Sequence, residues 1–251
     1  MILHISDLHY GQAGAVSANA RILNAIASRP DVAECTLVIT GDINDTPNRA
    51  IYQTSTSALR DVCGRVKRVV MCDGNHDIDI FGLSRSMKGL TLFADQHKQL
   101  TGLPYRPPVA CVDEEEGIAY LSVSTCVRAS RRFGAVDILA TGMIGEEQIR
   151  DICEAVKHHR AMGRRIVIAM HHCPTGGNPA LRLSDRHSFG EALEAVGGVD
   201  LILTGHLHRA GHWTRVFGTR NLIASAKSPD SRSYTQIAMD GDRIDATTIS
   251  A

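Results

Sequence analysis

Short apolar segments recur along the chain, each bounded by glycine or polar residues, and they define its predicted strands. Segments of a few residues rich in Ile, Val and Leu are typical of strands that are buried on both faces. We expect six such strands, at Ile2–Ile5, Leu37–Thr40, Val69–Cys72, Ala119–Val123, Ile166–Met170 and Leu201–Leu203.

Segments with helical character lie between and after these strands. In the second of them Thr46 is the expected N-cap and Pro47 occupies the first helical position, where its missing N–H costs nothing. We expect helices at Ser17–Ser28, Pro47–Val62, Ser84–Leu100, Glu146–Ala161 and Ser188–Val196. The alternation of strand and helix predicts an α/β fold with a largely parallel sheet.

The pattern changes after residue 210, where short strand-like segments are separated by Gly, Asn and Asp. They predict an antiparallel sheet in the last quarter of the chain, built from Trp213–Phe217, Asn221–Ala224, Tyr234–Met239 and Arg243–Ile249. Thr101–Gly117 shows neither the helical nor the strand pattern of apolar residues, and we expect a surface excursion followed by a hairpin there. No linker interrupts the pattern, so we expect a single domain over residues 1–251.

The composition narrows the class of protein. Hydrophobic residues make up 43% of the chain and charged residues 22%, a balance typical of globular domains. The 27 basic and 27 acidic residues cancel, so no long-range field attracts nucleic acid or an anionic membrane, and a nucleic-acid partner is disfavoured. The seven cysteines form no C-x-x-C pair, which favours reduced thiols and a cytoplasmic location. We expect neither a signal peptide nor a membrane-spanning helix.

Residues that bind metals or move protons follow five of the predicted strands, always at the carboxyl end. In an open parallel sheet these ends face one crevice, so we expect the five clusters to converge. In chain order they are Asp7 and His9, Asp42, then Asn75, His76 and Asp77, then His171 and His172, and finally His206 and His208.

The donor types in these clusters indicate a metal centre. Carboxylate and amide oxygens combined with imidazole nitrogens, without thiolate, suit zinc, manganese, iron, cobalt or nickel. Two aspartates, one asparagine and four histidines exceed the four ligands of a structural zinc site, which favours two ions with open positions for water and substrate. His171 and His172 are adjacent and point to opposite sides, so only one is expected to bind, and we choose His171.

The ordered set D-x-H, GD, GNHD, a histidine after a strand, and G-H-x-H resembles the signature of the calcineurin-like metallophosphoesterases over residues 1 to about 225. The resemblance implies a four-layer α/β/β/α sandwich whose second sheet is supplied partly by the C-terminal strands. It also implies individual roles. Asp7, His9 and His208 would hold the first ion, Asp42 would bridge both, and Asn75, His171 and His206 would hold the second.

The resemblance also implies that the dinuclear centre hydrolyses phosphate esters. Water shared by two cations loses its proton near neutral pH, and the resulting bridging hydroxide attacks phosphorus. His76 would stay unligated beside the substrate and donate a proton to the leaving oxygen, with Asp77 orienting its ring. Arginines near the predicted rim could meet a phosphate, although a solvated surface is the simpler interpretation; they are Arg128, Arg131, Arg132, Arg182, Arg186 and Arg209.

The expected activity is that of a phosphodiesterase acting on small phosphodiesters or cyclic nucleotides. The same motifs occur in phosphomonoesterases, nucleotide pyrophosphohydrolases and DNA nucleases, so these remain alternatives. A catalytically silent interaction scaffold is the alternative from another class, and the retention of His76 and all seven ligands argues against it. The expected partner is a small phosphate ester, and a dimer is compatible with the sequence.

Overall fold

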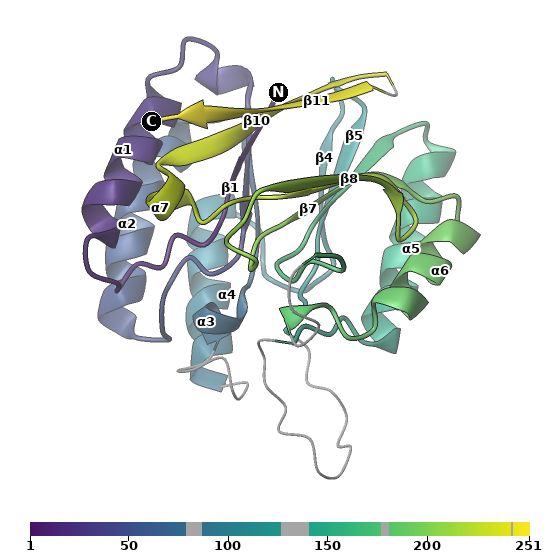
Figure 1. The fold of residues 1–251 in the computed structure, drawn as a ribbon, viewed down its shortest axis with the longest axis horizontal. Helices are drawn as coiled ribbons and strands as arrows, with labels where there is room; N and C mark the ends of the chain where they lie inside the picture. Colours follow the sequence, from purple (N-terminus) through teal and green to yellow (C-terminus); the bar gives the residue numbers. More distant parts are fainter. Residues whose placement is uncertain (79–86, 127–140, 177–180, 242) are drawn as a thin grey trace.

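Two β-sheets stack face to face in the computed structural model, and helices cover their outer faces (Figure 1). The structure describes residues 1–78, 87–126, 141–176, 181–241 and 243–251. Between the sheets lies an apolar core that includes Val38, Val167 and Leu203. This arrangement confirms the expected four-layer α/β/β/α sandwich. Among the described residues, no helix combines the length and apolar character needed to cross a membrane.

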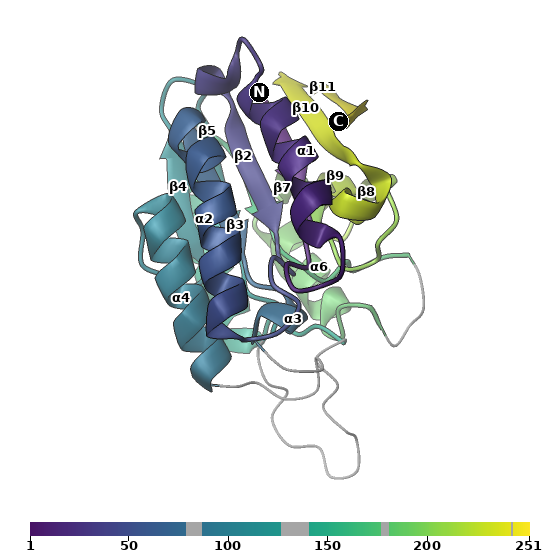
Figure 2. The ribbon, with the colours of Figure 1, turned by 90° about the vertical axis from the view of Figure 1, so that its left-hand side faces the viewer.

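The first sheet has the strand order β11–β10–β1–β2–β3. Its strands β1 (Ile2–Ile5), β2 (Thr36–Thr40) and β3 (Arg68–Cys72) run parallel, whereas β10 (Ser233–Asp240) is antiparallel to β1 and to the edge strand β11 (Arg243–Ser250). The helices α1 (Ala15–Ala27), α2 (Arg49–Arg65) and α4 (Met87–Thr101) cover its outer face (Figure 2).

Side-chain alternation along the central strands explains why this sheet is buried on both faces. In β2, Leu37 and Ile39 pack against the helices, while Val38 points into the core between the sheets. A continuous apolar run is therefore required here, and the sequence supplies it.

The second sheet has the order β4–β5–β6–β7–β9–β8. Its strands are β4 (Val109–Asp113), β5 (Ile118–Ser122), β6 (Arg165–Ala169), β7 (Val199–Thr204), β8 (Gly211–Val216) and β9 (Thr219–Ala224). Helices α5 (Glu146–Ala161) and α6 (Arg186–Ala195) pack on its outer face. The hairpin expected within 101–117 is present in part, as β4 pairs antiparallel with β5.

The start of α2 differs from the prediction. The side chain of Asn48 accepts a hydrogen bond from the Ala50 N–H at 2.9 Å, so Asn48 is the N-cap and the helix begins at Arg49. Pro47 therefore precedes the helix. An Asn side chain satisfies a free N–H of the first turn directly, which explains why the helix begins there.

The C-terminal strands form antiparallel pairs as predicted, but the prediction of one C-terminal sheet is wrong, because the two pairs divide between the two sheets. β8 and β9 extend the second sheet, and β9 runs parallel to β7. β10 and β11 complete the first sheet beside β1. Strand character can be read from alternation and turn residues, but the pairing partner depends on which sheet edge is open in three dimensions.

Three short helices complete the described part of the chain: the 3-10 helix η1 (Val32–Glu34), α3 (Asn75–Ile78) and α7 (Ser228–Ser231). α3 directly follows β3, and α7 packs against α1. The Ser228 N–H donates to the Ser6 carbonyl at 3.1 Å, so α7 braces the segment that leaves β1.

Candidate metal centre

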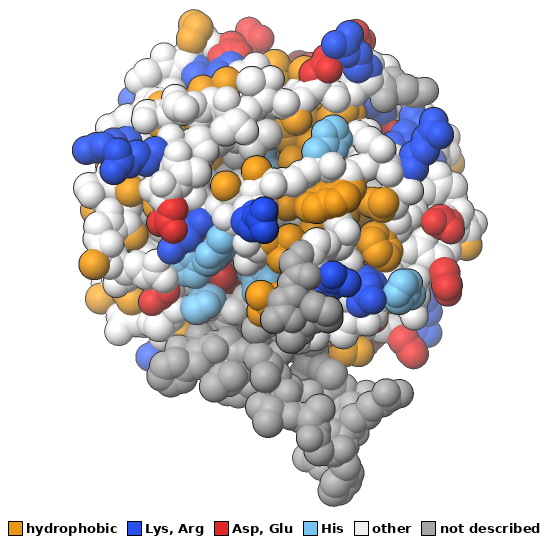
Figure 3. All heavy atoms as spheres, in the orientation of Figure 1, with side chains coloured by type: hydrophobic (Ala, Val, Ile, Leu, Met, Phe, Trp, Pro, Cys, Tyr) orange, Lys and Arg blue, Asp and Glu red, His pale blue; other side chains and the backbone are white. Residues whose placement is uncertain are grey.

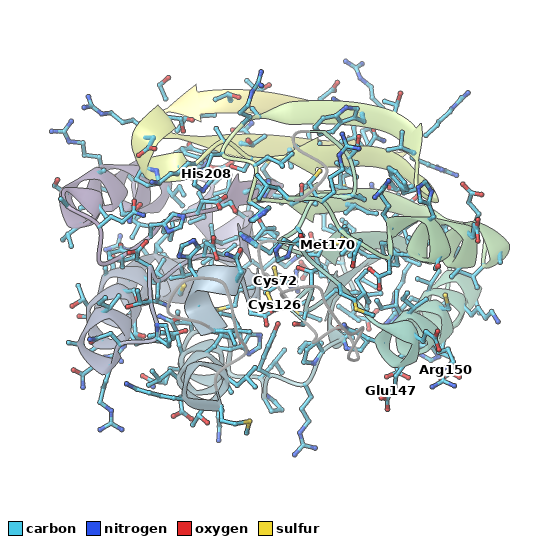
Figure 4. All side chains as sticks on the ribbon, turned by 60° about the horizontal axis from the view of Figure 1, so that its bottom comes forward. Cys72, Cys126, Glu147, Arg150, Met170 and His208 are labelled. Atoms are coloured by element: carbon cyan, nitrogen blue, oxygen red, sulfur yellow. The ribbon has the colours of Figure 1, made fainter. Side chains whose placement is uncertain are left out.

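Asp7, His9 and His208 form the first group of ligand atoms, which all lie within 4.8 Å of one another. His208 Nε2 lies 3.4 Å from Asp7 Oδ1 and 3.3 Å from His9 Nε2. Asp7 and His9 leave β1 of the first sheet, and His208 follows β7 of the second. Figure 4 shows His208 on its loop, whereas Glu147 and Arg150 point outward from α5. The two sheets thus share this group.

Asp42 and His171 belong to a second group, which also includes Asp7. His171 Nε2 lies 3.2 Å from Asp42 Oδ2 and 3.1 Å from Asn75 Oδ1. Its other ring nitrogen, Nδ1, is 2.7 Å from the Thr40 carbonyl. A carbonyl only accepts, so Nδ1 carries a proton, and the tautomer with Nε2 unprotonated would offer its lone pair to an ion held beside the carboxylate and the amide oxygen. This tautomer suits a metal ligand.

His206 and His172 join His171 in a third group. The ring of His206 lies 5.0 Å from that of His171 and 4.4 Å from that of His172, centroid to centroid. His172 Nδ1 is 2.8 Å from the Thr125 hydroxyl oxygen. The structure therefore brings all seven expected ligands to one place, and it places His172 beside them.

Left-handed backbone marks these positions. Five of the seven have positive φ, namely Asp7 (56°), His9 (44°), Asp42 (50°), His206 (67°) and His208 (53°). Non-glycine residues adopt this conformation rarely and at a cost of about 1–3 kcal/mol each, and such strain concentrates at functional sites. The turns after β1, β2 and β7 are thus shaped by the ligand cluster at the expense of local stability.

Two glycines of the motifs allow the close approach of the ligand-bearing segments. A Cβ on Gly74 would lie 2.2 Å from Asp42 Oδ1, and one on Gly205 would lie 1.9 Å from Ser6 Oγ. No side chain fits at either position. The glycines of GNHD and G-H-x-H are therefore required by packing between segments.

Charge is concentrated in a buried environment. Burial alone would raise the pKa of Asp42, but His171 and the neighbouring histidines lower it well below its ordinary value. Burial would likewise lower the pKa of His171, yet the charges of Asp42 and Asp7 raise it to about 10. Buried carboxylates that depend on positive charge, surrounded by imidazoles, fit bound divalent cations.

His76 lies at the mouth of the cluster with a third of its side chain exposed (33%). Its Nδ1 is 3.1 Å from the Asp45 carbonyl oxygen, and its ring packs edge-on against His9 with centroids 4.9 Å apart. Because Nδ1 is engaged by a carbonyl, Nε2 is the nitrogen available to a substrate.

The expected contact between Asp77 and the His76 ring is wrong. Asp77 is fully buried, and its Oδ2 accepts the N–H groups of Gly74 at 3.0 Å and Ile43 at 3.3 Å, while Oδ1 accepts that of Asn44 at 2.8 Å. Burial and the charge of Asp42 raise the pKa of Asp77 to about 7. α3 turns the Asp77 side chain inward, away from the imidazole of the preceding residue His76.

Asp45 is a residue of the site that the sequence reasoning missed. Its Oδ1 lies 3.2 Å from His9 Nδ1 and 3.9 Å from His76 Nδ1, and it accepts a 2.7 Å hydrogen bond from Gln12 Nε2. Lys227 Nζ in turn donates to Gln12 Oε1 at 2.7 Å. The signal for Asp45 was present in GDIND, where a second acidic residue follows Asp42 in the same polar loop.

The structure describes three of the six candidate arginines. Arg182 Nε donates to the Gly176 carbonyl at 2.7 Å, Arg186 begins α6, and Arg209 is exposed after the G-H-x-H motif. Arg128, Arg131 and Arg132 lie outside the described residues. On the face seen in Figure 3, histidine side chains reach the surface with basic side chains beside them.

Known structures share this fold. A dimetal phosphatase from Danio rerio is similar over 99% of this chain and 98% of its own, with a TM-score of 0.68 and 16% identity. A putative 5'-nucleotidase from Staphylococcus aureus is similar over 99% of this chain and 52% of its own, with a TM-score of 0.56 and 13% identity. A purple acid phosphatase from yellow lupin is similar over 90% of this chain and 43% of its own, with a TM-score of 0.55 and 11% identity.

At these identities the likeness establishes the fold alone. No curated protein sequence matches the chain. The sequence profile of the calcineurin-like phosphoesterases, however, matches residues 1–210, which include every residue of the ligand cluster. With its two stacked sheets and its converging aspartate and histidine side chains, the chain belongs to the calcineurin-like phosphoesterase family.

Proposed function

We propose that this protein is a dinuclear-metal-dependent phosphodiesterase that hydrolyses small phosphodiesters or cyclic nucleotides. One observation carries the proposal: Asp42 Oδ2 lies 3.8 Å from His9 Nε2 and 3.2 Å from His171 Nε2. A carboxylate between two groups of ligand atoms is the arrangement that a bridging ligand requires. The proposal rests on family membership for metal-dependent phosphoester hydrolysis and on the site geometry for the assignment of residues.

In this proposal Asp7, His9 and His208 would hold one ion, Asn75, His171 and His206 would hold the other, and Asp42 would be shared between them. The mixture of oxygen and imidazole donors fits manganese, iron, zinc, cobalt or nickel. When bound, two such ions supply Lewis-acid charge that polarises the phosphoryl group and lowers the pKa of the attacking water. His171 is preferred over its neighbour His172 because its Nε2 lies 3.2 Å from Asp42 Oδ2 and 3.1 Å from Asn75 Oδ1.

His76 acts on the leaving group. Its exposed ring presents Nε2 at the mouth of the centre, so it can donate a proton to the leaving oxygen as the ester bond breaks. Asp45 holds the ring through its carbonyl at 3.1 Å and faces the same nitrogen with its carboxylate at 3.9 Å.

Several features support a small diester as substrate. The complete motif set resembles that of the cyclic-nucleotide phosphodiesterase-like group, and the balanced charge of the chain supplies no extended field for a nucleic acid. The phosphatase and the nucleotidase with the same fold keep phosphomonoesters as the alternative. We also propose a cytoplasmic location, supported by all seven cysteines being free thiols.

A substrate panel tests the proposed activity. The metal-free protein, prepared with a chelator, is supplied in turn with manganese, zinc, cobalt, nickel or iron. Turnover is then measured on bis(p-nitrophenyl) phosphate, p-nitrophenyl phosphate, cyclic AMP, a dinucleotide and pyrophosphate. We expect diester cleavage that is lost on chelation and restored by added metal. Faster turnover of the monoester than of any diester contradicts the diesterase assignment, and no turnover on any substrate favours the silent scaffold.

A further inference from the structure

Gln96, on the outer-layer helix α4, is linked to the candidate metal centre by buried side chains. Its Oε1 accepts a hydrogen bond from Asn44 Nδ2 at 2.9 Å, and the same amide nitrogen donates to Asp77 Oδ1 at 3.1 Å. Gln96, Asn44 and Asp77 are 2%, 0% and 0% exposed. The side-chain amides of Gln96 and Asn44 therefore link helix α4 to the carboxylate of Asp77 in α3.

Each hydrogen-bonding group in this connection has a defined role. The Ser55 hydroxyl has one proton and two acceptors nearby, Asn44 Oδ1 at 2.6 Å and the Tyr52 carbonyl at 3.1 Å, and we assign the proton to the shorter contact. Its oxygen then accepts from Gln96 Nε2 at 2.8 Å. The second proton of Gln96 Nε2 goes to Thr56 Oγ1 at 3.0 Å. Both side-chain amides thus use both of their protons, and neither can be turned over without losing several bonds.

Asp77 joins the two loops that carry the ligands Asp42 and Asn75. Through Ile43 and Asn44 it holds the backbone immediately after Asp42, and through Gly74 it holds the residue before Asn75. The Tyr52 hydroxyl adds a bond to the Asp77 carbonyl at 2.6 Å. A shift of Asp77 would therefore move Asp42, Asn75 and His76 relative to one another.

We propose that Gln96 is a positioning residue, which through Asn44 and Asp77 fixes the turn that presents Asn75 and His76 beside Asp42. The inference deepens the proposed function and rests on it for its catalytic consequence. The physical reason is geometric: a proton donor must be held to a fraction of an ångström to act on a leaving oxygen, and a loop turn alone is too compliant. Gln96 lies on a packed helix and restrains this turn through its hydrogen bond to Asn44.

The experiment compares Gln96→Met with Gln99→Met, the same substitution at an exposed position one turn further along α4. Amide hydrogen exchange is measured in the metal-free protein at Asn44 and Gly74, whose N–H groups bond to Asp77. We expect exchange at both amides to be about tenfold faster in Gln96→Met, which corresponds to about 1.4 kcal/mol of local protection. Exchange at Val38, in strand β2 between β1 and β3, should not change. Gln99→Met should behave as wild type throughout.

The kinetic arm separates positioning from general stability. In metal-loaded Gln96→Met, kcat for a diester with an alkoxide leaving group should fall about tenfold while KM stays near the wild-type value. With a p-nitrophenolate leaving group, which leaves without protonation, the loss should be smaller. A purely structural role would lower the midpoint of thermal unfolding and leave kcat of the folded enzyme unchanged.

Ser55→Ala provides a milder perturbation in case Gln96→Met does not fold, with exposed Ser57→Ala as its control. It removes the proton donated to Asn44 and should speed exchange at Asn44 in the same direction. A folded Gln96→Met protein with wild-type exchange and wild-type kcat overturns the proposal. If the wild type cleaves no phosphodiester, the proposed function fails, and the exchange measurements still decide whether Gln96 holds the turn.

Discussion

The carboxylate of Asp7 accepts the backbone N–H of His206 at both of its oxygens, at 3.1 and 3.2 Å. Asp7 leaves β1 of the first sheet and His206 leaves β7 of the second, so this contact joins the two halves of the sandwich within the candidate metal centre. Neither half alone holds a complete set of ligands. Assembly of the centre therefore depends on the docking of one sheet on the other.

Asp42→Ala should abolish turnover. It removes the carboxylate that lies between His9 and His171, and it leaves the imidazole of His171 buried without its nearest negative charge. We expect kcat to fall on the order of 10³-fold and elemental analysis to show fewer than two metal ions per chain. Asp61→Ala, at an exposed ion pair on α2, is the control and should retain wild-type kcat and two metal ions per chain. Wild-type activity in Asp42→Ala would exclude the bridging role.

His76→Ala should keep its metals and lose rate. The side chain is one-third exposed and its ring packs edge-on against His9, and no metal ligand is removed, so elemental analysis should be unchanged. We expect kcat to fall by about 10² for alkoxide leaving groups and by much less for p-nitrophenolate, since the contribution of a general acid scales with the basicity of the leaving oxygen. Exposed His158→Ala is the matched control. Equal losses for both leaving groups would argue against proton donation.

The two adjacent histidines after β6 should differ in metal binding. His171 presents Nε2 to Asp42 and Asn75 while its Nδ1 is held by the Thr40 carbonyl; His172 contacts Thr125. His171→Ala should therefore release one of the two ions, and His172→Ala should retain both with altered activity. Titration of the metal-free variants with cobalt, followed by absorption spectroscopy, measures the stoichiometry. The reverse order of stoichiometries would assign His172 as the ligand.

Buried His4 should make the protein less stable in mild acid. Burial lowers its pKa from 6.5 to about 4, and its Nε2 contacts the Thr40 hydroxyl at 2.8 Å. The unfolded ring binds a proton near pH 6.5 and the folded ring does not, so the stabilisation present above pH 6.5 is lost as the pH falls toward 4. Between pH 7.5 and 5.5 the loss should be about 1.4 kcal/mol.

Urea unfolding of the metal-free protein at the two pH values tests this expectation. Between the two pH values, the free energy of unfolding should change by about 1.4 kcal/mol less in His4→Asn than in wild type. The other histidines contribute equally to both proteins, so their effects cancel in this difference. Exposed His212→Asn is the control and should follow wild type. If His4→Asn and wild type lose the same stability, the folded state tolerates a charged His4.

Some parts of this structure follow from local sequence patterns. The parallel strands could be predicted because apolar runs such as Val69–Cys72 are buried on both faces. The convergence of the proposed ligands could be predicted because they directly follow those strands, and the structure brings their side chains together. The cap at Asn48 and the sheet assignment of β8 to β11 were predicted incorrectly, since both depend on which donor or edge is available after packing.

The role of Asp77 shows where sequence reasoning ends at the site. Its place beside His76 in GNHD favoured a contact with that ring, but the helical turn directs its carboxylate to the backbone of another loop. Gln96 carries no local signal at all, because it is an ordinary polar residue within a helical pattern. Its connection to Asn44 exists only when α4 packs beside the loop after β2.

The sequence by itself determined which side chains are available for chemistry and that they follow buried strands, because donor type and hydrophobic periodicity are properties of the chain. The tertiary structure alone decided which of them meet. Contacts such as Asp7 with His206 and Asn44 with Gln96 join residues far apart in the sequence. Their distances depend on how two sheets and a helical layer pack, and packing is cooperative over the whole fold.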